Sequence, residues 1–125
     1  MTALLDHIGL PVSSLERSRT LYEAALATLG YKVVKQSSAS VGFGRDRKPE
    51  LTLFQSTQAP APAHIAFAAS SREMVDAFYQ AALAAGATDN GAPGLRPEYH
   101  VGYYGAFLLD ADGNNVEAVF HEGVI

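Results

Sequence analysis

The stretch DHIGLPVSSLE (residues 6–16) determines how the rest of the chain is interpreted. After His7, apolar residues stand at every second position, which is the period of a strand that buries one face. A second stretch, AHIAFAASSRE (residues 63–73), repeats the arrangement around His64, 57 positions later. The shift also aligns Ile8 with Ile65, Ser13 with Ser70, Ser14 with Ser71, Glu16 with Glu73, Tyr22 with Tyr79, Ala25 with Ala82, Leu26 with Leu83, and Ala27 with Ala84. The chain therefore contains two copies of one module.

Each copy continues from its first strand into a helix. Ser13 and Glu16 have the spacing of a capping box, and the same box recurs in the second copy at Ser70 and Glu73. The predicted buried faces are Leu15, Ser18, Tyr22, Ala25, Leu26 and Leu29 in the first helix, and Met74, Phe78, Ala81, Ala82 and Ala85 in the second. A glycine, residue 30 or 86, ends each helix.

Three short strands are expected after each helix. They are residues 32–36, 40–44 and 50–54, and then a weakly marked segment near Thr88, residues 101–109 and residues 115–121. The last two are joined by an Asp112-Gly113 turn. We therefore predict an α+β fold of two βαβββ modules, paired into a curled mixed sheet that encloses a cavity. The modules cover about residues 1–58 and 62–125 of a single domain, with APAPA (residues 59–63) as linker.

The composition excludes several classes of protein. With nine basic and thirteen acidic residues the net charge is −4, and the longest basic cluster is RDRK (residues 45–48), so nucleic acid is not expected as a partner. No segment approaches the roughly 18 apolar residues of a membrane span. We expect a cytoplasmic protein without membrane contact. The sequence has no cysteine, so any metal must be bound through nitrogen and oxygen.

Strand alternation places four polar side chains on one kind of surface. His7 and His64 oppose the apolar residues of their strands, and so do Glu50 and Glu117 in theirs. All four are predicted on the sheet face that no helix covers. Two imidazoles and two carboxylates around a cavity suit a divalent first-row metal. The alternative is that the histidines are structural and the glutamates are solvated, with Glu50 a strand-entry residue after Pro49.

The order of these motifs resembles the vicinal oxygen chelate superfamily, which includes glyoxalase I, fosfomycin and bleomycin resistance proteins, and extradiol dioxygenases. The supporting stretches are DHIGLPVSSLERSRTLYEAALATLGYKVV, AHIAF and LLDADGNNVEAVF. The resemblance implies that His7, His64 and Glu117 bind a divalent metal ion (Zn, Ni, Mn or Fe). It adds Glu50, whose ELT context is similar to that of a glyoxalase I ligand. Pro11 stands where glyoxalases of this size have a glutathione-binding arginine, so the substrate stays open.

The resemblance implies a metal-dependent lyase or isomerase that acts on a small oxygen-chelating substrate, with Glu117 or Glu50 as the catalytic base. Two alternatives stay open. One is an extradiol-type dioxygenase with a 2-His-1-carboxylate iron site, which a coordinating Glu50 would contradict. The other is a non-enzymatic protein of the bleomycin-resistance type that binds a drug or other small molecule without metal.

The segment GLRPEYHVGYYGAF (residues 94–107) is expected to bind the substrate. Its candidates are Arg96, Tyr99, His100, Tyr103 and Tyr104, which offer one cation and aromatic walls. Adjacent tyrosines point to opposite faces of a regular strand, so only one of the last two is expected in the cavity. The alternative is that the tyrosines are ordinary strand and interface residues. The resemblance further implies a homodimer, in which the modules pair within one chain or between two.

Overall fold

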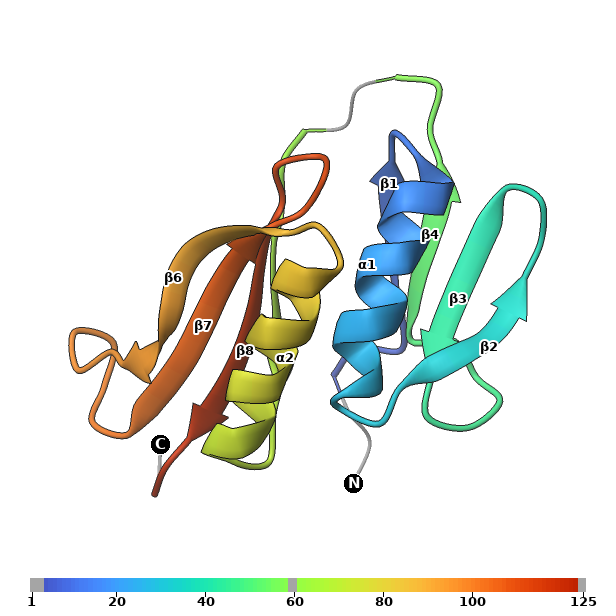
Figure 1. Ribbon diagram of the computed structural model, residues 1–125. Coiled ribbons are helices and arrows are strands. Elements are labelled where there is room, and N and C mark those ends of the chain that lie inside the picture. The colour runs from blue at the N-terminus through green and yellow to red at the C-terminus, as the bar shows by residue number, and fades with distance from the viewer. Residues whose placement is uncertain (1–3, 59–60, 124–125) are drawn as a thin grey trace.

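The computed structural model describes residues 4–58 and 61–123 and contains two copies of a βαβββ module (Figure 1). The first copy consists of β1 (Ile8–Val12), α1 (Leu15–Ala27), β2 (Lys32–Gln36), β3 (Ser40–Gly44) and β4 (Leu51–Gln55). The second consists of β5 (His64–Ala68), α2 (Arg72–Ala84), β6 (Thr88–Leu95), β7 (Tyr103–Leu109) and β8 (Asn115–His121). The predicted α+β class and the order of elements are confirmed.

The strands form two four-stranded mixed sheets, which do not close into a barrel. Their orders are β1-β4-β3-β2 and β5-β8-β7-β6, so the first strand of each module lies at a sheet edge. In both sheets this edge strand runs parallel to the last strand of its module, and the other pairs are antiparallel. The duplication of the sequence is thus reproduced in the strand pairing.

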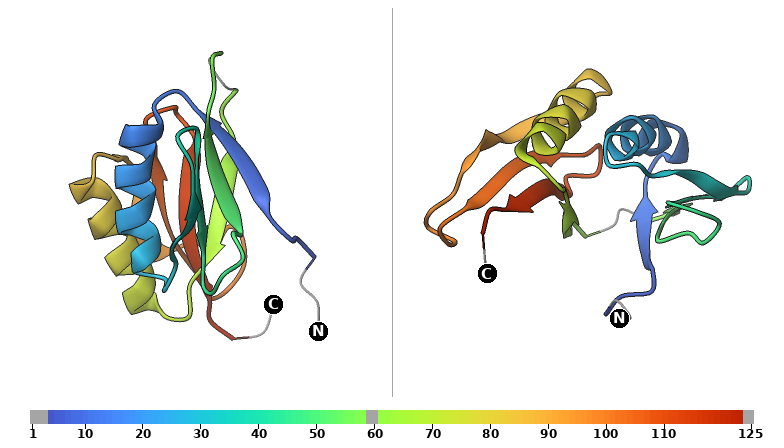
Figure 2. Two further views of the ribbon diagram at one scale, coloured as in Figure 1. Left: turned by 90° about the vertical axis from the view of Figure 1, so that its right-hand side faces the viewer. Right: turned by 90° about the horizontal axis from the view of Figure 1, so that it is seen from below.

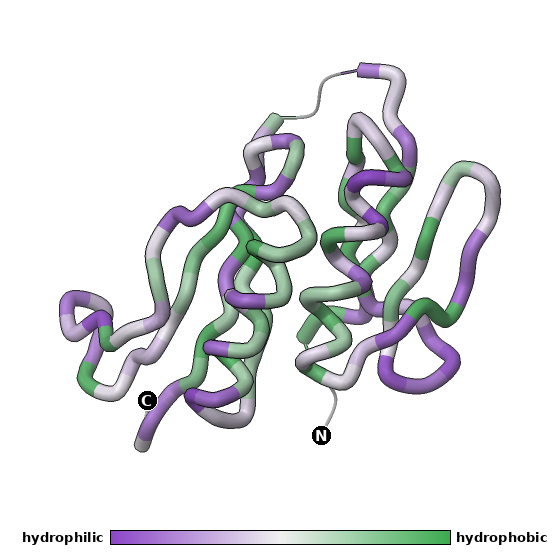
Figure 3. The backbone as a smooth tube through the Cα atoms, viewed as in Figure 1, coloured by the Kyte–Doolittle hydropathy of each residue, from purple (hydrophilic) through white to green (hydrophobic). Residues whose placement is uncertain are grey.

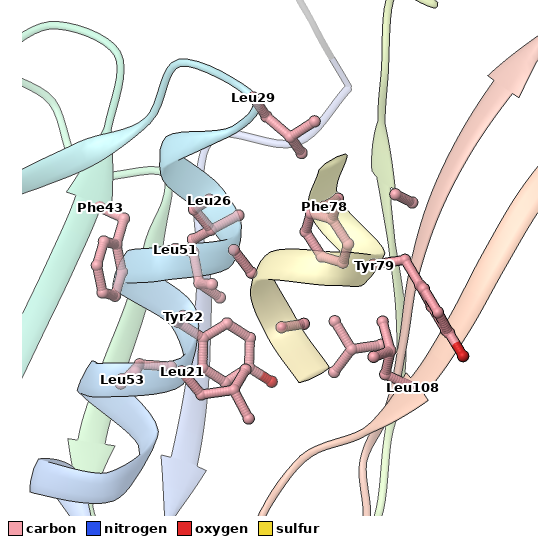
Figure 4. Close-up of a cluster of buried hydrophobic side chains, with 14 of the residues drawn as sticks. Leu21, Tyr22, Leu26, Leu29, Phe43, Leu51, Leu53, Phe78, Tyr79 and Leu108 are labelled. Atoms are coloured by element: carbon pink, nitrogen blue, oxygen red, sulfur yellow. The ribbon is translucent and has the colours of Figure 1, made fainter. Parts of the chain in front are cut away.

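The hydrophobic core lies where the two helices meet each other and their sheets. The helices α1 and α2 are in contact, and each also packs against strands of its own module (Figure 2). Leu26 and Phe78 represent the two helices in this core, and both are fully buried (Figure 4). Each such side chain contributes about 1.5–3 kcal/mol through its burial. Polar residues concentrate instead in the loops after β3 and β6 (Figure 3). This packing leaves the opposite face of each sheet without a helix.

The helix starts differ from the prediction by one residue. Ser14 and Ser71 are the N-caps, and their hydroxyl groups accept hydrogen bonds from the backbone N–H of Arg17 and Met74. The predicted capping boxes, which began one residue earlier, are therefore wrong. The backbone N–H of Ser13 instead donates to the carboxylate of Asp112, 3.1 Å away in the other module. A long-range contact thus takes the place of the local one.

The buried face of α2 is also rotated relative to the prediction. Val75 and Tyr79 join Phe78 and Ala82 in the core, whereas Met74 is only partly buried. The helix packs against both its own sheet and α1, so its apolar surface is wider than one stripe. Leu21 is added to the buried face of α1 for the same reason.

A buried hydrogen-bond network joins the two modules. The hydroxyl group of Tyr22 on α1 donates to Oδ2 of Asp110 at 2.7 Å, and Asp110 lies in the turn between β7 and β8. The side-chain amide of Asn114 donates to the same oxygen at 2.8 Å. Burial and the neighbouring carboxylate raise the pKa of Tyr22 far above its ordinary value. All three side chains of this network thus have a hydrogen-bond partner, and the contact between Tyr22 and Asp110 spans 88 residues of sequence.

None of the helices within residues 4–58 and 61–123 is long and apolar enough to cross a membrane.

Candidate functional site

The best-defined polar cluster lies on the helix-free face of the second sheet. His64 on β5 and Glu117 on β8 belong to neighbouring parallel strands, in which Ala66 pairs with Glu117. Strand alternation sends Val116 and Ala118 into the core and leaves Glu117 on the other face. The Nε2 atom of His64 lies 2.7 Å from Oε1 of Glu117. As the sequence predicted, a histidine and a glutamate from distant segments share this face.

Glu117 is buried although it is on the uncovered face. Its side chain is 1% exposed, whereas that of His64 is 55% exposed. Tyr103 on β7 closes the site by donating a hydrogen bond from its hydroxyl group to Oε2 of Glu117. Both carboxylate oxygens therefore have a partner. Burial and the hydrogen bond to Glu117 raise the pKa of Tyr103 above its ordinary value, so its hydroxyl group keeps its proton at neutral pH.

A glycine makes room for this arrangement. Gly105 lies on β7 two residues after Tyr103, on the same face of the sheet. A Cβ atom at this position would stand 3.1 Å from the Tyr103 ring and 3.4 Å from Oε2 of Glu117. The absence of a side chain at residue 105 is thus a condition for the contact between Tyr103 and Glu117.

Two further histidines stack beside Tyr103. Nε2 of His100 lies 2.9 Å from Nδ1 of His121, and the two rings are stacked with centroids 5.1 Å apart. Because Nδ1 of His100 must donate to the carbonyl oxygen of Val101, Nε2 of the neutral ring accepts, and Nδ1 of His121 is then the donor. His121 was not among the predicted site residues, although its alternation with Glu117 along β8 is visible in the sequence.

The other predicted substrate-binding residues divide between the two faces. The guanidinium group of Arg96 lies over the ring of Phe107, 5.4 Å from its centroid, and Tyr99 contacts Tyr103 with ring centroids 4.8 Å apart. Tyr104 lies on the helix side, where its hydroxyl group donates to Asp76 of α2 at 2.6 Å. As alternation predicts, only the first of the adjacent tyrosines joins the cluster around Glu117. Tyr104 is outside it.

The remaining two predicted ligands lie in the first module. His7 directly precedes β1, and Glu50 directly precedes β4. Nδ1 of His7 lies 2.8 Å from Oδ2 of Asp6, and Glu50 accepts a hydrogen bond from Nε of Arg45 at 3.1 Å. His7 and Glu50 line one cavity of about 240 Å³, whose far wall is formed by β5. Each module therefore supplies one histidine and one glutamate.

The register shows that these two glutamates are not equivalent. In the first sheet Ile8 pairs with Leu51, and in the second Ile65 pairs with Val116. The residue that follows Val116 is Glu117, and the residue that follows Leu51 is Thr52. Thr52 therefore occupies the position that corresponds to Glu117, and Glu50 is two residues away from it on the same face.

The family model described as "Glyoxalase/Bleomycin resistance protein/Dioxygenase superfamily" matches residues 4–118. The chain belongs to this superfamily. Its paired βαβββ modules agree with that membership, which confirms the resemblance found in the sequence.

Solved structures of the superfamily have the same fold. A glyoxalase/bleomycin resistance protein from Albidiferax ferrireducens T118 is 31% identical over 96% of this chain and 100% of its own, with a TM-score of 0.77. A proposed glyoxalase from Bacillus halodurans is 26% identical over 94% of this chain and 95% of its own, with a TM-score of 0.74. A superfamily enzyme from Burkholderia phytofirmans PsJN has 21% identity and a TM-score of 0.73, covering 96% of this chain and all of its own. A search of curated proteins finds no match.

The candidate metal ligands of this superfamily member are divided between its two modules. Across the part of the chain that the structure describes, no three histidine or acidic side chains are close enough together to hold one ion. The donors instead form two pairs, one in each module. Imidazole nitrogen and carboxylate oxygen suit Zn, Ni, Mn or Fe. The type of donor thus fits a first-row metal, whereas one pair alone supplies too few ligands.

Proposed function

We propose that this protein is a metal-dependent lyase or isomerase of the glyoxalase type that acts on a small oxygen-chelating substrate. The observation that carries the proposal is the buried carboxyl group of Glu117, held by His64 and Tyr103 on a sheet face that no helix covers. Buried acidic groups are rare unless a partner or a function retains them. This one is reached from the surface through the half-exposed ring of His64.

The proposed metal site combines residues of two copies of the chain. His64 and Glu117 of one copy, with His7 and Glu50 of the other, supply two nitrogen and two oxygen donors for Zn, Ni, Mn or Fe. Two features favour a homodimer of this kind. First, within the described residues of one chain, the His7–Glu50 pair and the His64–Glu117 pair do not combine into one group of ligands. Second, both histidines lie at edge strands, since His64 begins β5 and His7 directly precedes β1. When bound, the metal supplies Lewis acidity to two neighbouring substrate oxygens.

The chain's own residues have three roles in this proposal. Glu117 or Glu50 is the base that takes a proton from the substrate and returns it. Tyr103 positions Glu117, because its hydroxyl group donates to Oε2. His64, which lies beside Oε1, is a metal ligand in this proposal. Arg96 and Tyr99 line a cavity on the second sheet, and His100 contacts the ring of Tyr103. In this proposal the guanidinium group of Arg96 binds an acidic group of the substrate. Tyr104 is not included, because it lies on the other face.

A ring-cleaving dioxygenase is the second candidate, and the strand register favours it. With Thr52 in the position equivalent to Glu117, and Arg45 bound to Glu50, the set that remains is two histidines and one carboxylate. That set is typical of non-haem iron oxygenases. A variant in which Glu50 is replaced by glutamine separates the two candidates. The lyase proposal expects weaker metal binding and lost activity, and the dioxygenase candidate expects both to be retained.

The first experiment measures metal. Protein purified without chelator is analysed for bound Zn, Ni, Mn and Fe, and its melting temperature is recorded with each ion added to metal-free protein, iron under nitrogen. We expect one ion to raise the melting temperature in the wild type and not in Glu117→Gln. A folded wild type with neither bound metal nor a shift contradicts the proposal. Such a result would favour a small-molecule binding protein, in which His64 and Tyr103 simply satisfy Glu117.

A further inference from the structure

A second cavity opens on the helix-free face of the first sheet, apart from the cluster around Glu117. Its volume is about 300 Å³. The residues on which the inference depends are Asp6, His7, Lys35, Ser40, Lys48 and Thr52. They come from the segment before β1, from β2, from β3 and β4, and from the loop before β4. A volume of this size is at the lower end for sites that bind small molecules, about 300–1,000 Å³.

The charges in this cavity do not cancel. Nζ of Lys48 lies 2.8 Å from Oδ1 of Asp6, and Nδ1 of His7 lies 2.8 Å from its Oδ2. The single carboxylate is thus already paired. The ammonium group of the exposed Lys35 has no ion pair or side-chain hydrogen bond to any residue within 4–58 and 61–123, so this second positive charge of the cavity is not neutralised by a carboxylate.

Hydroxyl groups stand beside this ammonium group. In the register of the sheet, Lys35 pairs with Gly42, and Gly42 pairs with Thr52, so the three residues form one row across β2, β3 and β4. Gly42 presents no side chain between the other two. A Cβ atom there would stand 3.4 Å from Oγ1 of Thr52, and 2.8 Å from Cβ of Pro49, so the floor of the cavity depends on this glycine. Ser40 adds a second hydroxyl group on the same face.

We propose that this cavity is an anion-binding subsite in which Lys35 and Thr52 hold a carboxylate or phosphate group of the substrate. The ammonium group supplies charge, and the hydroxyl groups donate hydrogen bonds to the anion oxygens. The proposal deepens the function proposed above and rests on it, because the cavity also contains His7. A substrate anchored here by its acidic group presents its remaining atoms to the histidine. The substrate class is therefore a small organic acid or phosphate compound.

Binding of anions to metal-free protein tests the subsite separately from the metal site. Chelator is used to remove metal and is then dialysed away, because it is itself an anion. Phenylacetate, phenylphosphonate and inorganic phosphate are titrated at low ionic strength, with phenylacetamide as the uncharged control. Backbone amide shifts of Lys35, Gly42 and Thr52 are followed by NMR. We expect saturable shifts with the anions and none with phenylacetamide.

The variant Lys35→Gln is expected to bind at least about tenfold more weakly, since a hydrogen bond to a charged group is lost. The matched control is Lys32→Gln, which removes an exposed lysine of the same strand that does not line the cavity. It should change affinity by less than about twofold. Phosphate and phosphonate binding without phenylacetate binding identifies a phosphate group, and binding of all three anions identifies acids in general.

Absence of saturable shifts, or equal affinity in Lys35→Gln and wild type, overturns the subsite. Both results are read in protein without metal. If the wild type binds the anions but is not stabilised by any metal, the proposed function is contradicted and the subsite stands. If metal stabilises the wild type but no anion binds, only the subsite is contradicted.

Discussion

Nε2 of His64 lies 2.7 Å from Oε1 of Glu117, a contact between residues 53 positions apart in the sequence. One partner is half-exposed and the other is 1% exposed. The pair therefore links the interior of the second sheet to its surface. Any group that binds Glu117 from outside must meet the imidazole first, or displace the hydroxyl group of Tyr103 from the other oxygen.

The variant Glu117→Gln should separate metal binding from folding. The amide keeps the volume of the side chain but replaces one acceptor oxygen by an NH2 donor, so the hydrogen bond from either His64 or Tyr103 is lost in its present form. We expect the free energy of unfolding to fall by about 1–3 kcal/mol without metal. We also expect the metal-dependent rise in melting temperature to disappear. Urea denaturation and thermal shifts measure the two effects, and an unchanged response to metal would exclude Glu117 as a ligand.

The variant Tyr103→Phe should flatten the dependence of stability on alkaline pH. Burial, followed by the hydrogen bond to Glu117, raises the pKa of Tyr103 in the folded protein. A raised pKa means that stability is fully present below the unfolded value of about 10 and is lost as the pH rises through the folded value. We expect the unfolding free energy of the wild type to fall more steeply than that of the variant between about pH 9 and 11. Parallel curves would contradict this.

The variant Gly105→Ala should disturb the contact between Tyr103 and Glu117 without removing either residue. Its Cβ atom would stand 3.1 Å from the tyrosine ring, and we expect overpacking to lower stability by about 1–3 kcal/mol. Gly9→Ala is the control, because its Cβ atom meets Phe54 at an ordinary 3.4 Å. Denaturant titration of both variants is the measurement. A Gly105→Ala protein as stable as Gly9→Ala would show that the tyrosine moves at no cost.

The variant Tyr22→Phe should weaken the packing of the first module against the second. It removes the donor to Asp110 in a fully buried network, at an expected cost of about 1–3 kcal/mol. Tyr79→Phe is the matched control, since that hydroxyl group bonds to Asp89 within the second module only, at 2.8 Å. Urea denaturation combined with light scattering reports stability and association state. Equal losses in the two variants would argue against a special role for the contact between modules.

Most of the fold could be predicted because local patterns of apolar and turn residues specify its helices and strands. Three strands, β2, β3 and β8, have the predicted bounds, since alternation and turn residues lie within each segment. The helix starts at Ser14 and Ser71 could not be located to the residue. A carboxylate from the other module binds the N–H of Ser13, and no local pattern contains that contact.

Strand alternation predicts on which face of the sheet each candidate side chain lies, but not the register between strands. Alternation placed Glu117 and His64 on the helix-free face, and the register brings them together. It could not show that Thr52, rather than Glu50, corresponds to Glu117, because the register of a parallel pair depends on the partner strand. The stacking of His100 on His121 joins a loop residue to the end of a strand, so it was also beyond sequence patterns.

The two equivalent tyrosines of the duplicated helices have hydrogen-bond partners in different modules. Tyr22 reaches across to an aspartate of the other half, whereas Tyr79 bonds to an aspartate of its own. Two copies of the second half would each satisfy their tyrosine alone and gain no cross-link. Two copies of the first half would have no acceptor for Tyr22. The repeats are therefore not interchangeable, because Tyr22 finds its acceptor only when a first half is joined to a second half.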